Sequence, residues 1–164
     1  MKRKNGIAVL ILAAAVTTVS SYALKANAGQ DTSSPITAHD QAALQMDGVT
    51  LKKPDAAANL TNEQAISIAS KYAPGYAKEA NDINAEYQLM TNNHFALFSE
   101  AAKEKNPQLQ KEGFLKDTPV YIVTFKGITK KGHASIGQEP VVNHEFNVVV
   151  DANSGEVLYA FTYR

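Results

Sequence analysis

Three residues near the C-terminus have the spacing that begins a calcium-binding loop. Asp151, Asn153 and Gly155 alternate as the first ligands of an EF-hand do. An EF-hand also requires a glycine at its sixth position and a bidentate glutamate at its twelfth, but Glu156 and Thr162 occupy those places. We therefore predict a chain reversal and no metal site. Asp or Asn side chains would bond the local backbone there, and Gly155 would adopt a positive φ.

Histidines are the other candidate metal ligands. His94, His133 and His144 lie in the region expected to fold, and His144-Glu145 lacks the second histidine that a zinc-protease helix requires. We interpret them as surface or loop histidines, with a weak zinc-binding or pH-sensing role as the alternative. The sequence thus predicts no metal and no cofactor.

No set of residues has the pattern of a catalytic site. Residues 132–137, Gly-His-Ala-Ser-Ile-Gly, are similar to a nucleophile elbow, but the spacing differs by one residue and the segment falls in a predicted loop. Glu100 and Glu104 are interleaved with Lys103 and Lys105, which is typical of a solvated helix face. We predict no catalytic residues, and therefore that the protein is not an enzyme.

The N-terminal residues have the pattern of a secretory signal peptide. Residues 2–4 are basic, residues 7–16 form an uncharged apolar run, and residues 26–28 read Ala-Asn-Ala, a small-x-small cleavage site. We predict a signal peptide over residues 1–28 and a mature start at Gly29. The apolar run of ten residues is shorter than the roughly 20 residues that a bilayer-spanning helix needs, which favours cleavage. Counting residues 17–24 makes a span possible, so an uncleaved membrane anchor is the alternative. Both interpretations predict a secreted or extracytoplasmic protein.

Composition excludes several classes of partner and site. The chain has no cysteine, which rules out disulfides, thiolate metal sites and cysteine nucleophiles. It has 16 basic and 16 acidic residues, and residues 1–28 hold four of the basic ones and no acid. The remainder therefore has 12 basic and 16 acidic residues, a net charge of −4. Because its longest basic runs are pairs, Lys52-Lys53 and Lys130-Lys131, we predict no nucleic-acid partner.

The exported part divides into a tether and one domain. Residues 29–57 are mostly small, polar or proline, and we predict a flexible tether there, with a strand over residues 48–51 as the alternative. Residues 58–164 fall within the usual size of a single domain.

A helix is predicted at the start of this domain. Thr61 and Gln64 have the spacing of a capping box, and Pro74-Gly75 provides the stop. Between them, apolar residues recur at helical spacing. Over residues 91–106 we favour an extended stretch to Phe98 followed by a short helix capped by Ser99, although one helical stripe through this segment is the alternative.

Alternating apolar residues predict strands over 85–90, 120–126, 146–150 and 157–163, with a loop over 127–144. A helix before several antiparallel strands predicts an α+β fold in which the helix covers one face of the sheet and the last two strands form a hairpin. The expected contacts join three helix residues to three strand residues: Ile66, Ile68 and Tyr72 to Phe125, Val148 and Tyr159.

The order of these elements resembles the PepSY domain. The most specific part is residues 146–158, Phe-Asn-Val-Val-Val-Asp-Ala-Asn-Ser-Gly-Glu-Val-Leu, supported by residues 60–66 at the helix start and residues 119–125 in a strand. PepSY modules occur in propeptides of thermolysin-type metalloproteases and as free-standing, largely bacterial exported proteins. The resemblance covers residues 58–164 and implies a cystatin-like fold, no catalytic residues and a role in restraining peptidases. Insertions at about 91–118 and after Gly127 depart from the short form of the family.

Taken together, these patterns predict an exported PepSY-like binding module that modulates or inhibits an extracellular peptidase or an envelope protein. The alternative is a structural or ligand-binding protein of the cell envelope that binds wall polymer or a small molecule. The sequence identifies no binding residues, and it leaves the oligomeric state open.

Overall fold

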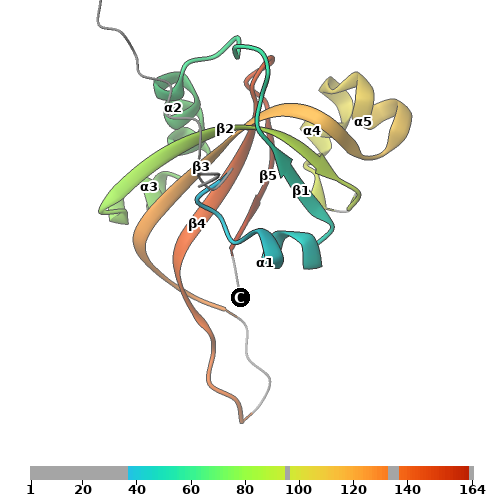
Figure 1. The fold of residues 1–164 in the computed structure, drawn as a ribbon. Coiled ribbons are helices and arrows are strands. Elements are labelled where there is room, and N and C mark those ends of the chain that lie inside the picture. The colour runs from blue at the N-terminus through green and yellow to red at the C-terminus, as the bar shows by residue number, and fades with distance from the viewer. Residues whose placement is uncertain (1–36, 95–96, 133–136, 163–164) are drawn as a thin grey trace, which may run out of the picture. The chain divides into compact units, whose positions relative to one another are not determined.

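Five strands form an antiparallel sheet in which each strand pairs with the next along the chain (Figure 1). The computed structural model describes residues 37–94, 97–132 and 137–162, all within the unit Ser33–Arg164. The strands are β1 Val49–Lys52, β2 Asp82–Asn92, β3 Leu115–Lys131, β4 Val142–Asp151 and β5 Val157–Phe161. The fold is therefore α+β, as predicted. The predicted signal peptide, residues 1–28, lies outside the described residues.

Both faces of the sheet are buried along its centre, because β3 and β4 carry apolar residues on both sides of their pleats. Val120, Ile122 and Val149 belong to one core cluster, whereas Val123 and Val148 belong to the other. All five are fully buried. A strand that is apolar on both faces needs a cover on each.

Helices supply those two covers (Figure 1). The first cluster contains residues of α1 Gln41–Met46, α4 Glu100–Lys105 and α5 Pro107–Glu112. The second contains residues of α2 Asn62–Tyr72, and α3 Pro74–Glu79 packs against it. The expectation of helix on only one face is therefore wrong, because the three short helices that cover the other face carry too little periodicity to be counted as a layer.

Local signals placed α2 correctly. Thr61 Oγ1 accepts from the Gln64 amide at 3.3 Å, and the Gln64 side chain accepts from the Thr61 amide at 2.8 Å, which is the predicted capping box. The buried face of α2 consists of alanines, however: Ala65 and Ala69 are fully buried, whereas Tyr72 is 52% exposed. Small side chains let the helix axis approach the sheet closely.

Two of the expected helix contacts are corrected by this arrangement. Tyr72 points largely to solvent and does not fill the helix–sheet interface. Tyr159 belongs to the opposite core cluster, because its register partner Val149 faces away from α2. Ile66 and Ile68 do pack against the same cluster as Phe125 and Val148.

Part of the predicted tether is folded. Within residues 29–57, α1 and β1 are regular elements, and β1 pairs with β2 in the register Val49↔Asn92 to Lys52↔Leu89. Leu44 and Val49 are each only 3% exposed. The strand kept as an alternative for residues 48–51 is the one observed, because its pairing with β2 and its burial, neither of which is local, stabilise it.

The helical part of the favoured prediction after β2 is confirmed, but the extended part is not, because β2 ends at Asn92 and the Leu97 amide donates to the His94 carbonyl at 3.0 Å, as in a turn. Ser99 caps α4, since its hydroxyl accepts from the Ala102 amide at 3.0 Å. Pro107 does end α4, but it also opens α5, in which it occupies the first turn after the cap Asn106. Residues 95–96 lie outside the described part of the chain.

Both ends of the predicted loop over residues 127–144 are strand. β3 continues to Lys131 and β4 begins at Val142, and the register between them shifts at Lys126/Lys130. Figure 1 shows these two strand ends extending beyond the sheet as an arm. Gly127 sits at this shift with φ 77°, a conformation that glycine adopts most readily. Among the helices of the described residues, none is long and apolar enough to cross a bilayer.

Candidate functional site

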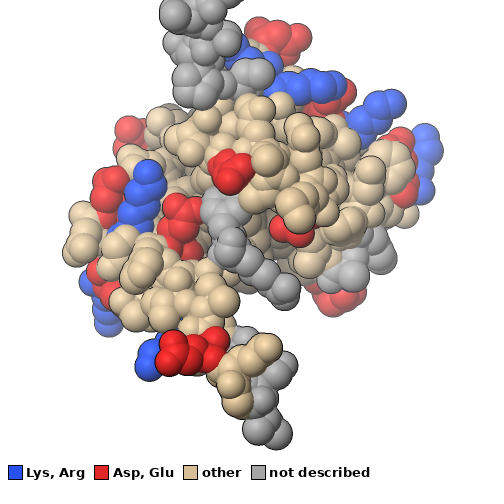
Figure 2. Space-filling model, turned by 60° about the horizontal axis from the view of Figure 1, so that its bottom comes forward, with Lys and Arg blue, Asp and Glu red and all other residues tan. Residues whose placement is uncertain are grey.

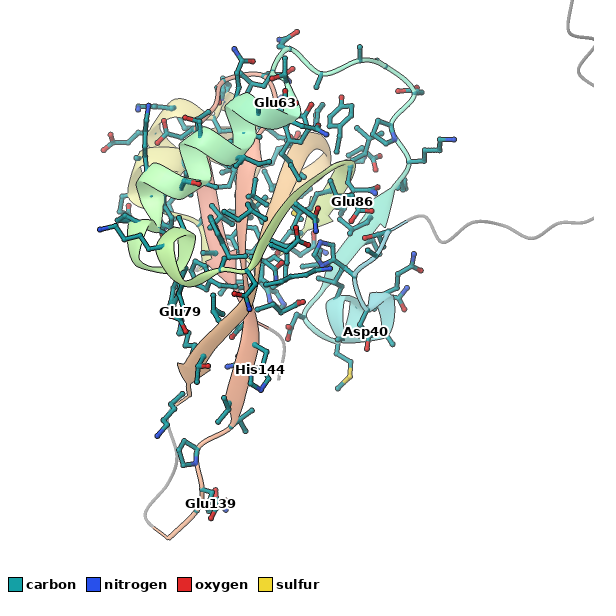
Figure 3. The ribbon with its side chains drawn as sticks, turned by 90° about the vertical axis from the view of Figure 1, so that its left-hand side faces the viewer. Asp40, Glu63, Glu79, Glu86, Glu139 and His144 are labelled. Carbon is teal, nitrogen blue, oxygen red and sulfur yellow. The ribbon has the colours of Figure 1, made fainter. Side chains whose placement is uncertain are left out.

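The residues that sequence patterns singled out do not gather into one site. His94 lies beside Gly48, whereas His144 lies on the arm, where its Nδ1 is 3.2 Å from the Ile128 carbonyl (Figure 3). His133 and the elbow-like Ser135 lie outside the described residues. Within the described ranges, no group of three or more His, Asp or Glu side chains is arranged to hold a metal ion.

The segment that resembles a calcium loop is a turn. Asp151 Oδ1 accepts from the amides of Asn153 and Ser154, both at 2.9 Å, and Gly155 has φ 74°. Asp151 Oδ2 accepts from Asn106 Nδ2 at 3.1 Å. The bonds of Oδ1 to the local backbone are those predicted for the turn, whereas the bond of Oδ2 to Asn106 joins a distant segment.

Two lysines of α4 form ion pairs. Lys103 Nζ lies 2.7 Å from Glu100 Oε1, and Lys105 Nζ lies 2.7 Å from Glu156 Oε2. Ion pairs of this kind at the protein surface contribute at most about 1 kcal/mol. The predicted solvated helix face is confirmed for Glu100.

A hollow lies on the sheet face opposite α2. Its volume is about 510 Å³, which falls within the range of about 300 to 1,000 Å³ that small-molecule sites occupy. Strands β2, β3 and β4 form its floor, and a short segment before α1 forms its wall. The lining includes both apolar and ionisable groups: Ala38, His39, Asp40, Ala43, Asn84, Glu86, Ile122, Thr124, Lys126 and Glu145.

We call residues 37–40 the strap and this hollow the strap pocket. Glu86 on β2 holds the strap, because its carboxylate accepts from Thr37 Oγ1 at 2.9 Å and from the Ala38 amide at 3.3 Å. His39 Nε2 lies 3.6 Å from the same carboxylate. One acidic side chain thus fixes three consecutive residues. Figure 3 shows Glu86 and Asp40 on the side of the sheet where the strap runs, away from Glu63 on α2.

A chain of buried polar contacts forms the floor of the strap pocket. Thr124 Oγ1 donates to Asn147 Oδ1 at 2.7 Å, and Asn147 Nδ2 donates to Glu145 Oε1 at 3.3 Å. Thr124 is 4% exposed and Asn147 is fully buried. Buried amide and hydroxyl groups need hydrogen-bond partners, so this network fixes the Glu145 carboxylate at the pocket edge.

Burial controls the charge of the strap histidine. Desolvation lowers the pKa of His39 below its usual value of 6.5, while the Glu86 and Glu145 carboxylates oppose that shift and Lys126 adds to it. Its imidazole is therefore mainly neutral at pH 7. The remaining ionisable groups of the pocket are three carboxylates, those of Asp40, Glu86 and Glu145, and the single ammonium of Lys126.

Two of those carboxylates retain an open acceptor. Asp40 caps α1 through Oδ1 alone, at 2.9 Å from the Ala42 amide and 3.1 Å from the Ala43 amide. Glu145 uses only Oε1 in the floor network. Neither forms a salt bridge with any residue in the described part of the chain. On the face of the molecule in Figure 2, acidic and basic side chains are interspersed.

Sequence reasoning missed this site. His39 and Asp40 lie in the segment interpreted as tether, and Glu86 and Glu145 occur singly in strands. Their proximity depends on the strand order and on the path of the strap, neither of which leaves a local pattern. The one available signal was the polar alternation of β2, in which Glu86 and Gln88 share a face.

No family model, no curated protein and no solved structure matches this chain.

Proposed function

We propose that the chain is an exported PepSY-like binding module that modulates or inhibits an extracellular peptidase or another envelope protein. The sequence of residues 146–158 and the position of α2 on the sheet support this proposal. In it, β4 and β5 correspond to the C-terminal hairpin of the PepSY module, and α2 on the sheet to the helix of a cystatin-like fold. The protein binds a partner and is not an enzyme.

The observation that carries the proposal is the strap pocket. It has the volume of a binding site, and its wall is fixed to the sheet by Glu86. Open carboxylate oxygens of Asp40 and Glu145 remain available to a ligand. Binding sites combine such a hollow with a few polar groups held by the scaffold.

Export follows from the leader-like pattern of residues 1–28. In this proposal the folded unit acts outside the cytoplasm, either released after cleavage or held at the membrane by the uncleaved segment. The absence of cysteine means that packing alone must hold the fold there.

A capture experiment tests the proposal. The full chain, immobilised through a C-terminal tag, is exposed to culture supernatant and to wall fractions of its own cell, and bound proteins are identified by mass spectrometry. We expect a secreted peptidase or an envelope protein, and a captured peptidase should be slowed by the purified chain at micromolar concentration. Recovery of no protein from either fraction would remove the proposal.

A ligand-binding envelope protein is the second candidate, because a pocket of 510 Å³ also accommodates a small molecule. This candidate predicts retention of the chain on wall polymer, or a bound metabolite, in place of a captured protein. The same capture experiment separates the two.

A further inference from the structure

The ionisable groups of the strap pocket define what can bind there. Asp40, Glu86 and Glu145 contribute three negative charges against the one positive charge of Lys126. A low-dielectric hollow lined mainly by one sign of charge concentrates ligands of the opposite sign.

The open carboxylate oxygens also favour a positively charged ligand. A carboxylate accepts hydrogen bonds and donates none, and Asp40 and Glu145 each have one oxygen without a bond from another described residue. A ligand that satisfies them must carry donors. Ammonium and guanidinium groups carry three and five N–H donors respectively, together with the complementary charge.

We propose that the strap pocket binds a cationic nitrogen group, an ammonium or guanidinium, presented by a peptide side chain or by a small amine. Asp40 and Glu145 accept hydrogen bonds from the group, and the apolar stem of the ligand lies against Ala38 and Ala43, the accessible apolar residues of the lining. Glu86 holds the strap in place, and Lys126 opposes binding. The inference rests on the proposed function, in which this pocket is the binding site.

The probes are capped tripeptides titrated into the full chain and followed by two-dimensional NMR. We expect Ala-Arg-Ala to shift amides of residues 38–43 and 122–126, and to bind at least about tenfold tighter than Ala-Gln-Ala or Ala-Glu-Ala. Ethylguanidinium distinguishes a small amine from a peptide side chain as the source of the cationic group. Equal affinity for ethylguanidinium and the arginine peptide would indicate a small amine, and a clear preference for the peptide would indicate a peptide side chain.

Charge-only variants test the residues. Asp40→Asn keeps a helix-capping acceptor, and Glu145→Gln keeps the acceptor for Asn147, so both preserve the local hydrogen bonds. Each should weaken binding of the arginine peptide about threefold to tenfold, whereas Lys126→Gln should strengthen it by a similar factor. Glu139→Gln is the matched control, since Glu139 lies on the arm, far from the pocket (Figure 3).

Several results would overturn the inference. These are equal binding of the three tripeptides, shifts confined to other parts of the chain, and Asp40→Asn and Glu145→Gln variants that match Glu139→Gln. Affinity of the wild-type chain that stays constant between 0.05 and 0.5 M salt would also contradict it, because a charge-driven contact weakens with salt.

The outcomes separate this inference from the proposed function. If a protein is captured but the arginine peptide does not bind, the inference fails and the proposed function stands. If the peptide binds in the pocket but no protein is captured, the proposed function as a protein-binding module fails and the cation site stands.

Discussion

Replacing Glu86 by alanine should release the strap without unfolding the sheet. Glu86 accepts from Thr37 Oγ1 at 2.9 Å and from the Ala38 amide at 3.3 Å, and it is close to His39. Hydrogen bonds to a charged group are each worth about 1.5 to 3 kcal/mol. The Glu86 side chain is 27% exposed, and water replaces part of what is lost, so we expect a total near 2 kcal/mol.

Native-state amide hydrogen exchange measures this change. A loss of about 2 kcal/mol corresponds to exchange about thirtyfold faster at the amides of Ala38, His39 and Ala42. Amides at the centre of β3 and β4 should keep their rates, because the pairing of these two strands and their buried core hold them independently of the strap. Glu86→Gln, which keeps one acceptor oxygen, should give an intermediate effect.

Glu79→Ala is the matched control. Glu79 Oε1 accepts from the Thr129 amide at 2.6 Å, and Figure 3 shows Glu79 at the end of α3, away from the strap. Its loss should speed exchange at Thr129 and leave the strap unchanged. Strap amides that exchange at wild-type rates in Glu86→Ala, or an equal acceleration throughout the sheet, would refute the role assigned to Glu86.

Three further predictions concern the scaffold and its pH response. Ala69→Leu should lower the free energy of unfolding by about 1 to 3 kcal/mol, because Ala69 is fully buried between α2 and the sheet; an unchanged melting temperature would contradict this packing. Gly127→Ala should lower the free energy of unfolding in urea by at least about 1 kcal/mol, since φ is 77° and the new Cβ would lie 2.5 Å from Asn81 Nδ2. The control Gly75→Ala places its Cβ with no atom within 4 Å and should leave the stability unchanged. Equal effects of the two variants would refute the strain argument. Burial lowers the pKa of His39, whose charged neighbours are Glu86, Glu145, Lys126 and Asp40, so the unfolded chain takes up this proton first as pH falls below 6.5. The free energy of unfolding should therefore decline below that pH, and it should decline less in His39→Gln. Identical pH profiles for the two proteins would exclude a contribution from His39.

Local sequence signals predicted the elements that begin or end at a side-chain cap. Thr61 with Gln64 starts α2, Ser99 starts α4, and Asp151 with Gly155 makes the turn before β5. In each case the deciding hydrogen bond joins residues within four positions, so the sequence contains the complete information.

Features that depend on distant contacts could not be predicted in the same way. α1 and β1 are short, and they are stabilised by burial of Leu44 and Val49 in a core cluster that includes Met90. Tyr72 has helical spacing with the buried residues of α2, yet the close approach allowed by Ala69 leaves Tyr72 outside the interface. Periodicity identifies a face but not how much of it the partner covers.

The candidate site belongs to this second group. Glu86, Lys126 and Glu145 come together only because β2, β3 and β4 are neighbours in the sheet, in a register fixed by the core. His39 joins them because the strap crosses the same face. Neither the strand order nor the path of the strap is written in any local motif.

The most direct test of the strap pocket as the binding site is a hydrogen-exchange footprint of the full chain with the partner recovered by capture. We expect slowed exchange over residues 37–43, 82–86 and 143–147, which surround the pocket. Protection confined to α2 and α3, or to the tip of the arm, would contradict the assignment of the pocket as the binding site.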